Sequence, residues 1–357
     1  MPTINLVLAG IHIQLVTHNA VLTELFLDYF SYYSPKIDDQ TIENGRLRLE
    51  MICPPRFPTL AEWLPPTARL ISETGVLRMW DDPACPSGSW YFHTEVAAFR
   101  VDIATSVTTG LVSPHAFDYP HILANTYAMF PLLLMLRSRG CYHLHAAGVV
   151  SPRGRLWLIS GSQRSGKTTL TTALGLAGWK PISDDSLLMT IDDGAPRIVA
   201  LRKYFHLGDA LLDSWPALGA IERRHHYLDR TCVAALQFFG ASILAEEQYL
   251  SVDHLLLPRI SGESSSRIDE ISPGNALLTL GEQSVYLQVW RDHTIRQWHG
   301  LEKIVRGASS FRLQSGIDLL ADPLLASRLL GQLETSFPSN QSERPVLADK
   351  PDPNHTD

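Results

Sequence analysis

The sequence predicts an α/β fold in which a glycine-rich loop joins a strand to a helix. Three observations lead to this prediction. From about residue 141 onward, short apolar strands alternate with helical segments, which is typical of a sheet covered by helices. A glycine-rich stretch fits GxxxxGK[ST] at one strand-to-helix junction. Before that point, segments that alternate apolar and polar residues indicate a smaller α+β unit. We therefore expect units at 1–140 and 141–335 and a disordered tail at 336–357.

The first unit contains the period-two patterns of strands and two helical patterns, and it shows no catalytic motif. A hairpin is expected because two alternating segments flank the turn-like Ala9-Gly10. Five prolines between residues 54 and 66 predict an irregular connection. The expected elements are strands at Ile4–Leu8, Ile11–Leu15, Arg46–Ile52 and within Trp90–Ile103, and helices at Val21–Phe30 and His121–Arg137.

The second unit alternates strands and helices around the glycine-rich stretch. The expected elements are strands at Tyr142–Val150, Arg155–Ser160, Val252–Pro258 and Ser309–Leu313, a strand region at Lys180–Thr190, and helices at Lys167–Gly175, Asn275–Leu280 and Pro323–Leu333. His143 and His145 alternate along the first strand, so we expect both on one face, in packing or hydrogen bonding rather than as a metal pair. The polar segment Ser336–Asp357 predicts disorder.

Composition narrows the partners of the chain. The 357 residues are 45% hydrophobic and 19% charged, which supports a packed core. A net charge of −7 gives no overall attraction to nucleic acid, so no nucleic-acid partner is expected. The longest apolar stretch, Met129–Leu136, is too short to span a bilayer. Met1–Ile13 lacks signal-peptide features and the four cysteines show no CxxC spacing, so we expect a cytoplasmic protein.

The glycine-rich stretch predicts a nucleotide site for ATP and Mg²⁺. It directly follows the apolar strand Leu156–Ile159. Its glycines allow successive backbone N–H groups to face phosphate oxygens, at the positive N-terminal end of the next helix. Lys167 can reach the β- and γ-phosphates, and the Thr168 hydroxyl can ligate magnesium. The expected nucleotide-binding residues are Gly161, Ser162, Gln163, Arg164, Ser165, Gly166, Lys167, Thr168 and Thr169.

Three acidic pairs could complete a metal site beside this loop, as phosphoryl transfer requires. They are Asp184-Asp185, Asp192-Asp193 and Glu246-Glu247. Gly194 follows the second pair and favours a turn there. Asp184-Asp185 ends a short strand that should reach the phosphates, so we prefer it. The chain has no NKxD-like or LSGGQ-like motif, which argues against a GTPase and an ABC ATPase.

Three sequence features resemble the catalytic domain of HPr kinase/phosphorylase and the broader HPr-kinase-related group of bacterial P-loop kinases. They are Leu144–Val149 (LHAAGV), the glycine-rich stretch, and Gly178–Asp185, which reads GW-x-x-x-SDD. The resemblance covers about residues 141–282. It implies a serine-directed kinase in which His145 lies near the active site, Lys167 and Thr168 contact phosphate and magnesium, Asp184 takes the proton of the hydroxyl, and Asp185 assists the metal. Relatives often assemble into oligomers, so a homo-oligomer is possible.

One departure limits what the resemblance implies. HPr kinases carry a Glu-Val-Arg-Gly-Leu-Gly stretch, whereas this chain has Ala200–His206, including Arg202, in the corresponding region. HPr as substrate and phosphorylase activity are therefore not implied. We expect a protein, a peptide or a small metabolite to supply the hydroxyl acceptor. The alternative is a regulatory or assembly ATPase without an acceptor; the intact Asp184-Asp185 pair favours the kinase.

Overall fold

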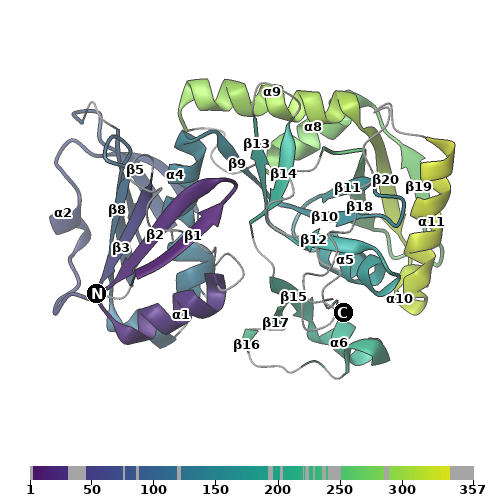
Figure 1. Cartoon of the computed structure of the whole chain (residues 1–357), viewed down its shortest axis with the longest axis horizontal. Helices are drawn as coiled ribbons and strands as arrows, with labels where there is room; N and C mark the ends of the chain where they lie inside the picture. Colours follow the sequence, from purple (N-terminus) through teal and green to yellow (C-terminus); the bar gives the residue numbers. More distant parts are fainter. Residues whose placement is uncertain are drawn as a thin grey trace, which may run out of the picture.

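A computed structural model gives the structure of the chain. It describes residues 3–30, 46–74, 77–85, 88–118, 122–191, 196–201, 204–219, 221, 225–227, 230–234, 239, 251–284 and 289–337. The expected tail from residue 338 onward, Arg202, and the acidic pairs Asp192-Asp193 and Glu246-Glu247 lie outside these ranges. The structure is mixed α/β, with several sheets and helices on their faces (Figure 1).

The N-terminal residues form an eight-stranded sheet in the order β1-β2-β3-β8-β7-β6-β5-β4. Its strands are β1 (Thr3–Leu8), β2 (Ile11–Thr17), β3 (Leu47–Ile52), β4 (Arg69–Thr74), β5 (Leu77–Asp81), β6 (Ser89–His93), β7 (Ala97–Asp102) and β8 (Val107–Val112). β3 is parallel to β2 and β8, and the other pairs are antiparallel. The expected β1–β2 hairpin is confirmed. Ala9 and Gly10 both have positive φ, as a two-residue hairpin turn requires.

Two helices cover one face of this sheet. α1 (Ala20–Phe30) and α4 (Met129–Ser138) contribute Leu22, Phe26 and Leu132 to the same core as the inward-facing residues of β1, β3 and β7. The helix expected at His121–Arg137 is interrupted, because a π-helical turn at Leu123–Tyr127 precedes α4. A short helix, α2 (Leu60–Trp63), forms within the proline-rich connection. A 3₁₀ turn at Pro114–Asp118 follows β8.

The rest of the chain forms three further sheets beside the first one (Figure 1). A six-stranded sheet has the order β12-β10-β11-β18-β20-β19, and two three-stranded sheets have the orders β14-β13-β9 and β15-β17-β16. The strands are β9 (Cys141–Leu144), β10 (Ala146–Val150), β11 (Leu156–Ser160), β12 (Lys180–Ser183), β13 (Leu187–Thr190), β14 (Arg197–Ala200), β15 (Tyr204–Gly208), β16 (His225–Tyr227), β17 (Arg230–Ala234), β18 (His254–Ile260), β19 (Arg267–Glu270) and β20 (Ser309–Ser315).

Helices cover both faces of the six-stranded sheet. On one face, α5 (Lys167–Leu176) and α11 (Pro323–Ser336) pack on Trp157 and Ile159 of β11. On the other face, α8 (Pro273–Glu282) and α9 (Arg291–Gly307) pack on Leu156 and Leu158. β11 is buried on both sides, which explains why it reads as a continuous apolar run. Shorter helical segments are α6 (Asp209–Ser214), a 3₁₀ turn at Pro216–Leu218, and α10 (Asp318–Ala321).

The strand expected at Tyr142–Val150 is not one strand. β9 pairs with β13 in a three-stranded sheet, whereas β10 pairs with β11 and β12 in the six-stranded sheet. The expectation was wrong because alternation along a chain shows burial but not a change of pairing partner. His145 stands at the change, outside both strands.

The two parts of the molecule meet through α4 and α9. The buried guanidinium of Arg137 donates to the carbonyl oxygen of Val289 (3.1 Å), the Thr294 hydroxyl (3.1 Å) and the Gln297 side chain. Figure 1 shows α9 running along the top of the molecule towards the eight-stranded sheet. The expected division near residue 140 stays a prediction. In the described part of the chain, no helix is long and apolar enough to cross a membrane.

Candidate active site

The candidate site lies where three parallel strands end. β11 is parallel to β18, and β18 is parallel to β20, so their carboxyl ends meet at one edge of the six-stranded sheet. Ligands of open α/β sheets bind outside this edge. The residues from Gly161 to Gly166 leave the end of β11 and lead directly into α5. The sequence therefore places the glycine-rich loop where the topology places a ligand.

Two glycines shape the loop. A Cβ on Gly161 would lie 2.9 Å from the Ser165 side-chain oxygen and 3.3 Å from the carbonyl oxygen of Pro258, so the turn leaves no room for a side chain. Gly166 has a φ of +97°, in the left-handed region that glycine tolerates best. Gly166 is also the N-cap of α5 and gives no side-chain cap. The first N–H groups of the helix are therefore available for an anion.

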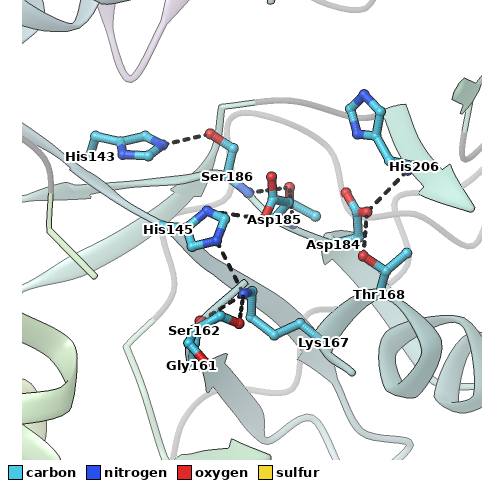
Figure 2. Close-up of polar contacts among 11 residues, drawn as sticks. His143, His145, Gly161, Ser162, Lys167, Thr168, Asp184, Asp185, Ser186 and His206 are labelled. Carbon is cyan, nitrogen blue, oxygen red and sulfur yellow. Dashed lines mark hydrogen bonds and ion pairs between the residues drawn. The ribbon is translucent and has the colours of Figure 1, made fainter. Parts of the chain in front are cut away.

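Lys167 turns its side chain back over the loop. Its ammonium nitrogen donates to the carbonyl oxygens of Gly161 (2.7 Å) and Ser162 (3.1 Å), as Figure 2 shows. The same nitrogen lies 3.1 Å from Nε2 of His145. Burial lowers the pKa of Lys167 below its usual value, and the carboxylates of Asp185 and Asp184 oppose this effect. The protonated ammonium thus depends on the two aspartates for part of its stabilisation.

The change of sheet places His145 beside Asp185. Two chain segments pass from the six-stranded sheet to the β9 sheet side by side, because Gly148 pairs with Ser183 on one side of the crossing and Leu144 pairs with Leu187 on the other. His145 and Asp185 therefore meet between these pairs. Nδ1 of His145 lies 3.0 Å from Oδ1 of Asp185.

These contacts select one form of the imidazole. A protonated Lys167 has only donors, so Nε2 of His145 must accept from it and carry no proton. The ring proton then lies on Nδ1 and is donated to Asp185. The result is a chain of hydrogen bonds from Lys167 through a neutral His145 to the Asp185 carboxylate (Figure 2). His143, expected on the same face, contacts Ser186 instead, at 2.8 Å.

Asp184 lies deeper than Asp185. Its side chain is fully buried, and its Oδ2 accepts from the Thr168 hydroxyl (3.0 Å) and from the backbone N–H of His206 (3.2 Å). The carboxylate is therefore fixed against the first turn of α5 (Figure 2). The side chain of Asp185 is 29% exposed and faces the cavity instead. Asp184 is thus buried, whereas its neighbour Asp185 is partly exposed to the cavity.

A cavity of about 660 Å³ opens over the loop. Of the residues expected from the sequence, those that line it are His145, Gln163, Arg164, Ser165, Gly166, Lys167, Thr168, Thr169 and Asp185. Gly161, Ser162 and Asp184 do not line it; Gly161 and Asp184 are buried, whereas Ser162 is exposed. His206 and Arg230 also line the cavity and were missed. They come from β15 and β17, which in the described part of the chain form a separate three-stranded sheet with β16, and no spacing in the sequence relates them to the loop.

The oxygen atoms beside the loop fit a magnesium ion. The Thr168 hydroxyl and the carboxylates of Asp184 and Asp185 are hard donors, and Mg²⁺ typically takes only one or two carboxylates and completes its shell with phosphates and water. Among the described residues there is no cluster of three or more His, Cys, Asp or Glu side chains that could hold a metal by themselves. The donor set suits a metal that arrives with a nucleotide.

No family model matches the chain, and no curated protein matches it. Among solved structures, the chain is similar to the HPr(Ser) kinase/phosphatase from Coxiella burnetii, at 14% sequence identity and a TM-score of 0.29. The match covers 54% of this chain and 97% of the other. Similarity at this level identifies no activity, and the expected membership of the HPr-kinase-related group stays a prediction.

Proposed function

We propose that the protein is an ATP- and Mg²⁺-dependent kinase that transfers the γ-phosphate to a serine-type hydroxyl of a protein, a peptide or a small metabolite. The observation that carries the proposal is the contact between Asp184 and Thr168 at the loop. P-loop enzymes use a loop Ser/Thr hydroxyl and a nearby aspartate to hold magnesium. Lys167 and the N-terminus of α5 would bind the phosphates. When bound, magnesium would neutralise charge on the phosphate oxygens.

The geometry favours an exchange of the roles expected for the two aspartates. Asp184 is fixed against the hydroxyl of Thr168, a residue that lines the cavity, which suits a residue that holds the metal together with Thr168. Asp185 faces the cavity and is held by His145, which suits a residue that orients the acceptor. We therefore assign the metal contact to Thr168 and Asp184, and the acceptor's proton to Asp185.

The transfer would then use this chain's groups as follows. The hydroxyl oxygen of the acceptor forms a bond to the γ-phosphorus while the bond from that phosphorus to the β–γ bridging oxygen breaks, and ADP leaves. The hydroxyl proton goes to the Asp185 carboxylate. Because phosphoryl transfer is largely dissociative, this carboxylate mainly orients the hydroxyl and accepts its proton late. His145 holds Asp185 in position, and Lys167 contacts the departing phosphates.

A labelling experiment tests the proposal. The purified protein would be incubated with γ-labelled ATP, magnesium and extract, beside Asp185→Asn, Asp184→Asn and the control Asp269→Asn, an exposed residue of β19. We expect a labelled acceptor with the wild type and with the control. Asp185→Asn should retain nucleotide binding but transfer about 10²- to 10⁴-fold more slowly. Asp184→Asn should weaken magnesium-dependent binding as well.

Two outcomes would contradict the proposal. Turnover of ATP without any labelled acceptor would favour a regulatory or assembly ATPase. Full transfer by Asp185→Asn with loss of transfer only in Asp184→Asn would restore the roles expected from the sequence. The cytoplasmic location and a possible homo-oligomer stay predictions.

A further inference from the structure

A second cavity adjoins the first one beside Gly166 and Thr169. It has a volume of about 200 Å³ and shares Gly166, Thr169, Ile260 and Leu320 with the larger cavity. Its remaining lining comes from α5, α11 and the segments that follow β18 and β20. The two cavities therefore adjoin at the N-terminus of α5.

Large apolar side chains surround this second cavity without being buried. Ile260, Ile317 and Leu320 all line it, and they are 60%, 62% and 50% exposed. Exposed single hydrophobic residues are ordinary, but a group that converges on one hollow marks a surface that a ligand can cover. Covering such side chains removes apolar area from water, which favours binding of an apolar or aromatic group.

The walls of the cavity are held in place by hydrogen bonds between the two segments. The N–H of Gly316 donates to the Ser266 hydroxyl (2.8 Å), and the N–H of Ile317 donates to the carbonyl oxygen of Glu263 (2.8 Å). The Asp318 carboxylate accepts from the N–H of Ser266 (2.8 Å). The segments after β18 and β20 are therefore joined to each other, and the cavity is formed before any ligand enters.

The position of the second cavity relative to the loop determines which part of a nucleotide it could hold. The triphosphate tail would lie on the loop after β11, and the cavity lies beyond the ends of β18 and β20, the next two strands along the same edge. A nucleotide that begins at the loop and follows this edge would bring its sugar past Gly166 and its base between Ile260, Ile317 and Leu320. A whole nucleotide thus spans both cavities.

We infer that this second cavity is the subsite for the nucleobase. The inference rests on the proposed nucleotide binding and adds its base specificity. Thr169 and Ser315 supply the polar side chains among the residues described around it, and the others are apolar or glycine. An apolar pocket discriminates weakly between related ligands, whereas a pocket built on hydrogen bonds discriminates strongly. ATP and GTP should therefore bind within about tenfold of each other.

Calorimetric titration of the full chain tests the subsite. The probes are Mg–ATP, Mg–GTP and magnesium tripolyphosphate, which has no base. The variants are Ile317→Ser and Leu320→Ser, both at positions whose side chains are exposed. The control is Leu278→Ser, at a residue of α8 that is also 62% exposed but does not line either cavity. Lys167→Ala tests phosphate binding separately.

We expect Ile317→Ser and Leu320→Ser each to weaken ATP binding about tenfold, through lost apolar contact, while tripolyphosphate binds as tightly as to the wild type. Leu278→Ser should change neither. Unchanged ATP affinity in both variants, or an ATP preference over GTP of more than about a hundredfold, would overturn the subsite. Slower transfer with unchanged nucleotide affinity would also overturn it, because the cavity would then serve the acceptor. If Lys167→Ala left all affinities unchanged, the proposed function itself would fail.

Discussion

The ammonium of Lys167 is held by neutral acceptors where a kinase would place charged ones. The carbonyl oxygens of Gly161 and Ser162 and the imidazole of His145 surround it, and its side chain is 5% exposed. Hydrogen bonds to charged acceptors are about twice as strong as bonds to neutral ones. Phosphate oxygens would therefore compete well for this ammonium. The residue is therefore already buried before a ligand binds.

A second buried residue makes stability depend on pH. His254 is buried in β18, its ring centroid lies 4.3 Å from that of Trp157, and burial lowers its pKa from 6.5 to about 4. The unfolded chain therefore binds a proton that the folded chain excludes, so stability falls as pH drops below about 6.5 and the loss is complete below about 4. We expect about 3 kcal/mol of stability to be lost across this window.

Thermal unfolding at pH 7 and pH 5 measures this effect. Replacement by Phe removes the titrating ring and keeps a flat apolar side chain against Trp157. His254→Phe should therefore show a smaller decrease in melting temperature between the two pH values than the wild type. An equal decrease in both proteins would show that other groups cause the acid sensitivity.

At the scale of elements, the loop between β11 and α5 depends on backbone shape. Gly166 and Gly154 both have positive φ, at +97° and +76°, but only Gly166 lines the cavity. Gly154 lies in the turn between β10 and β11, with open space around it. The two positions therefore share a backbone requirement and differ in their distance from the site.

Substitutions at Gly166 and Gly154 distinguish an effect on stability from an effect on nucleotide binding. Gly166→Ala and Gly154→Ala should each cost about 1 kcal/mol of stability, because alanine is strained at positive φ. Only Gly166→Ala should also weaken Mg–ATP binding, because it changes the direction of the loop N–H groups. Chemical unfolding and calorimetric titration measure the two quantities. Equal nucleotide affinity in both variants would show that the loop does not bind the phosphates.

Some elements could be predicted from the sequence and others could not. The β1–β2 hairpin, β11 and α5 follow from local periodicity and turn residues, and all three are confirmed. The helix α9 was missed because most of its residues are polar and only one side, including Leu301 and Ile304, is buried. The strands β4, β5 and β8 were missed as well. β4 and β5 pair with each other across a short connection, and β8 pairs with the preceding β7 and with β3, which lies far back along the chain.

At the scale of the whole molecule, the site is assembled from segments that the sequence does not relate. The loop and the Asp184-Asp185 pair were found because each is a short local motif. The contact between His145 and Asp185 forms where the chain crosses between two sheets. Arg230 reaches the site from a separate three-stranded sheet. Long-range pairing of strands sets these positions. A short sequence pattern does not reveal which distant strands will pair.

The measurement that tests the central claim most directly is thermal unfolding of the full chain with and without Mg–ATP, for the wild type and for Lys167→Ala. A ligand that binds only the folded state raises its stability, so saturating Mg–ATP should raise the wild-type melting temperature by about 2 to 5 °C. Lys167→Ala should show little or no increase. No increase in the wild type, or an equal increase in both proteins, would contradict nucleotide binding at this loop.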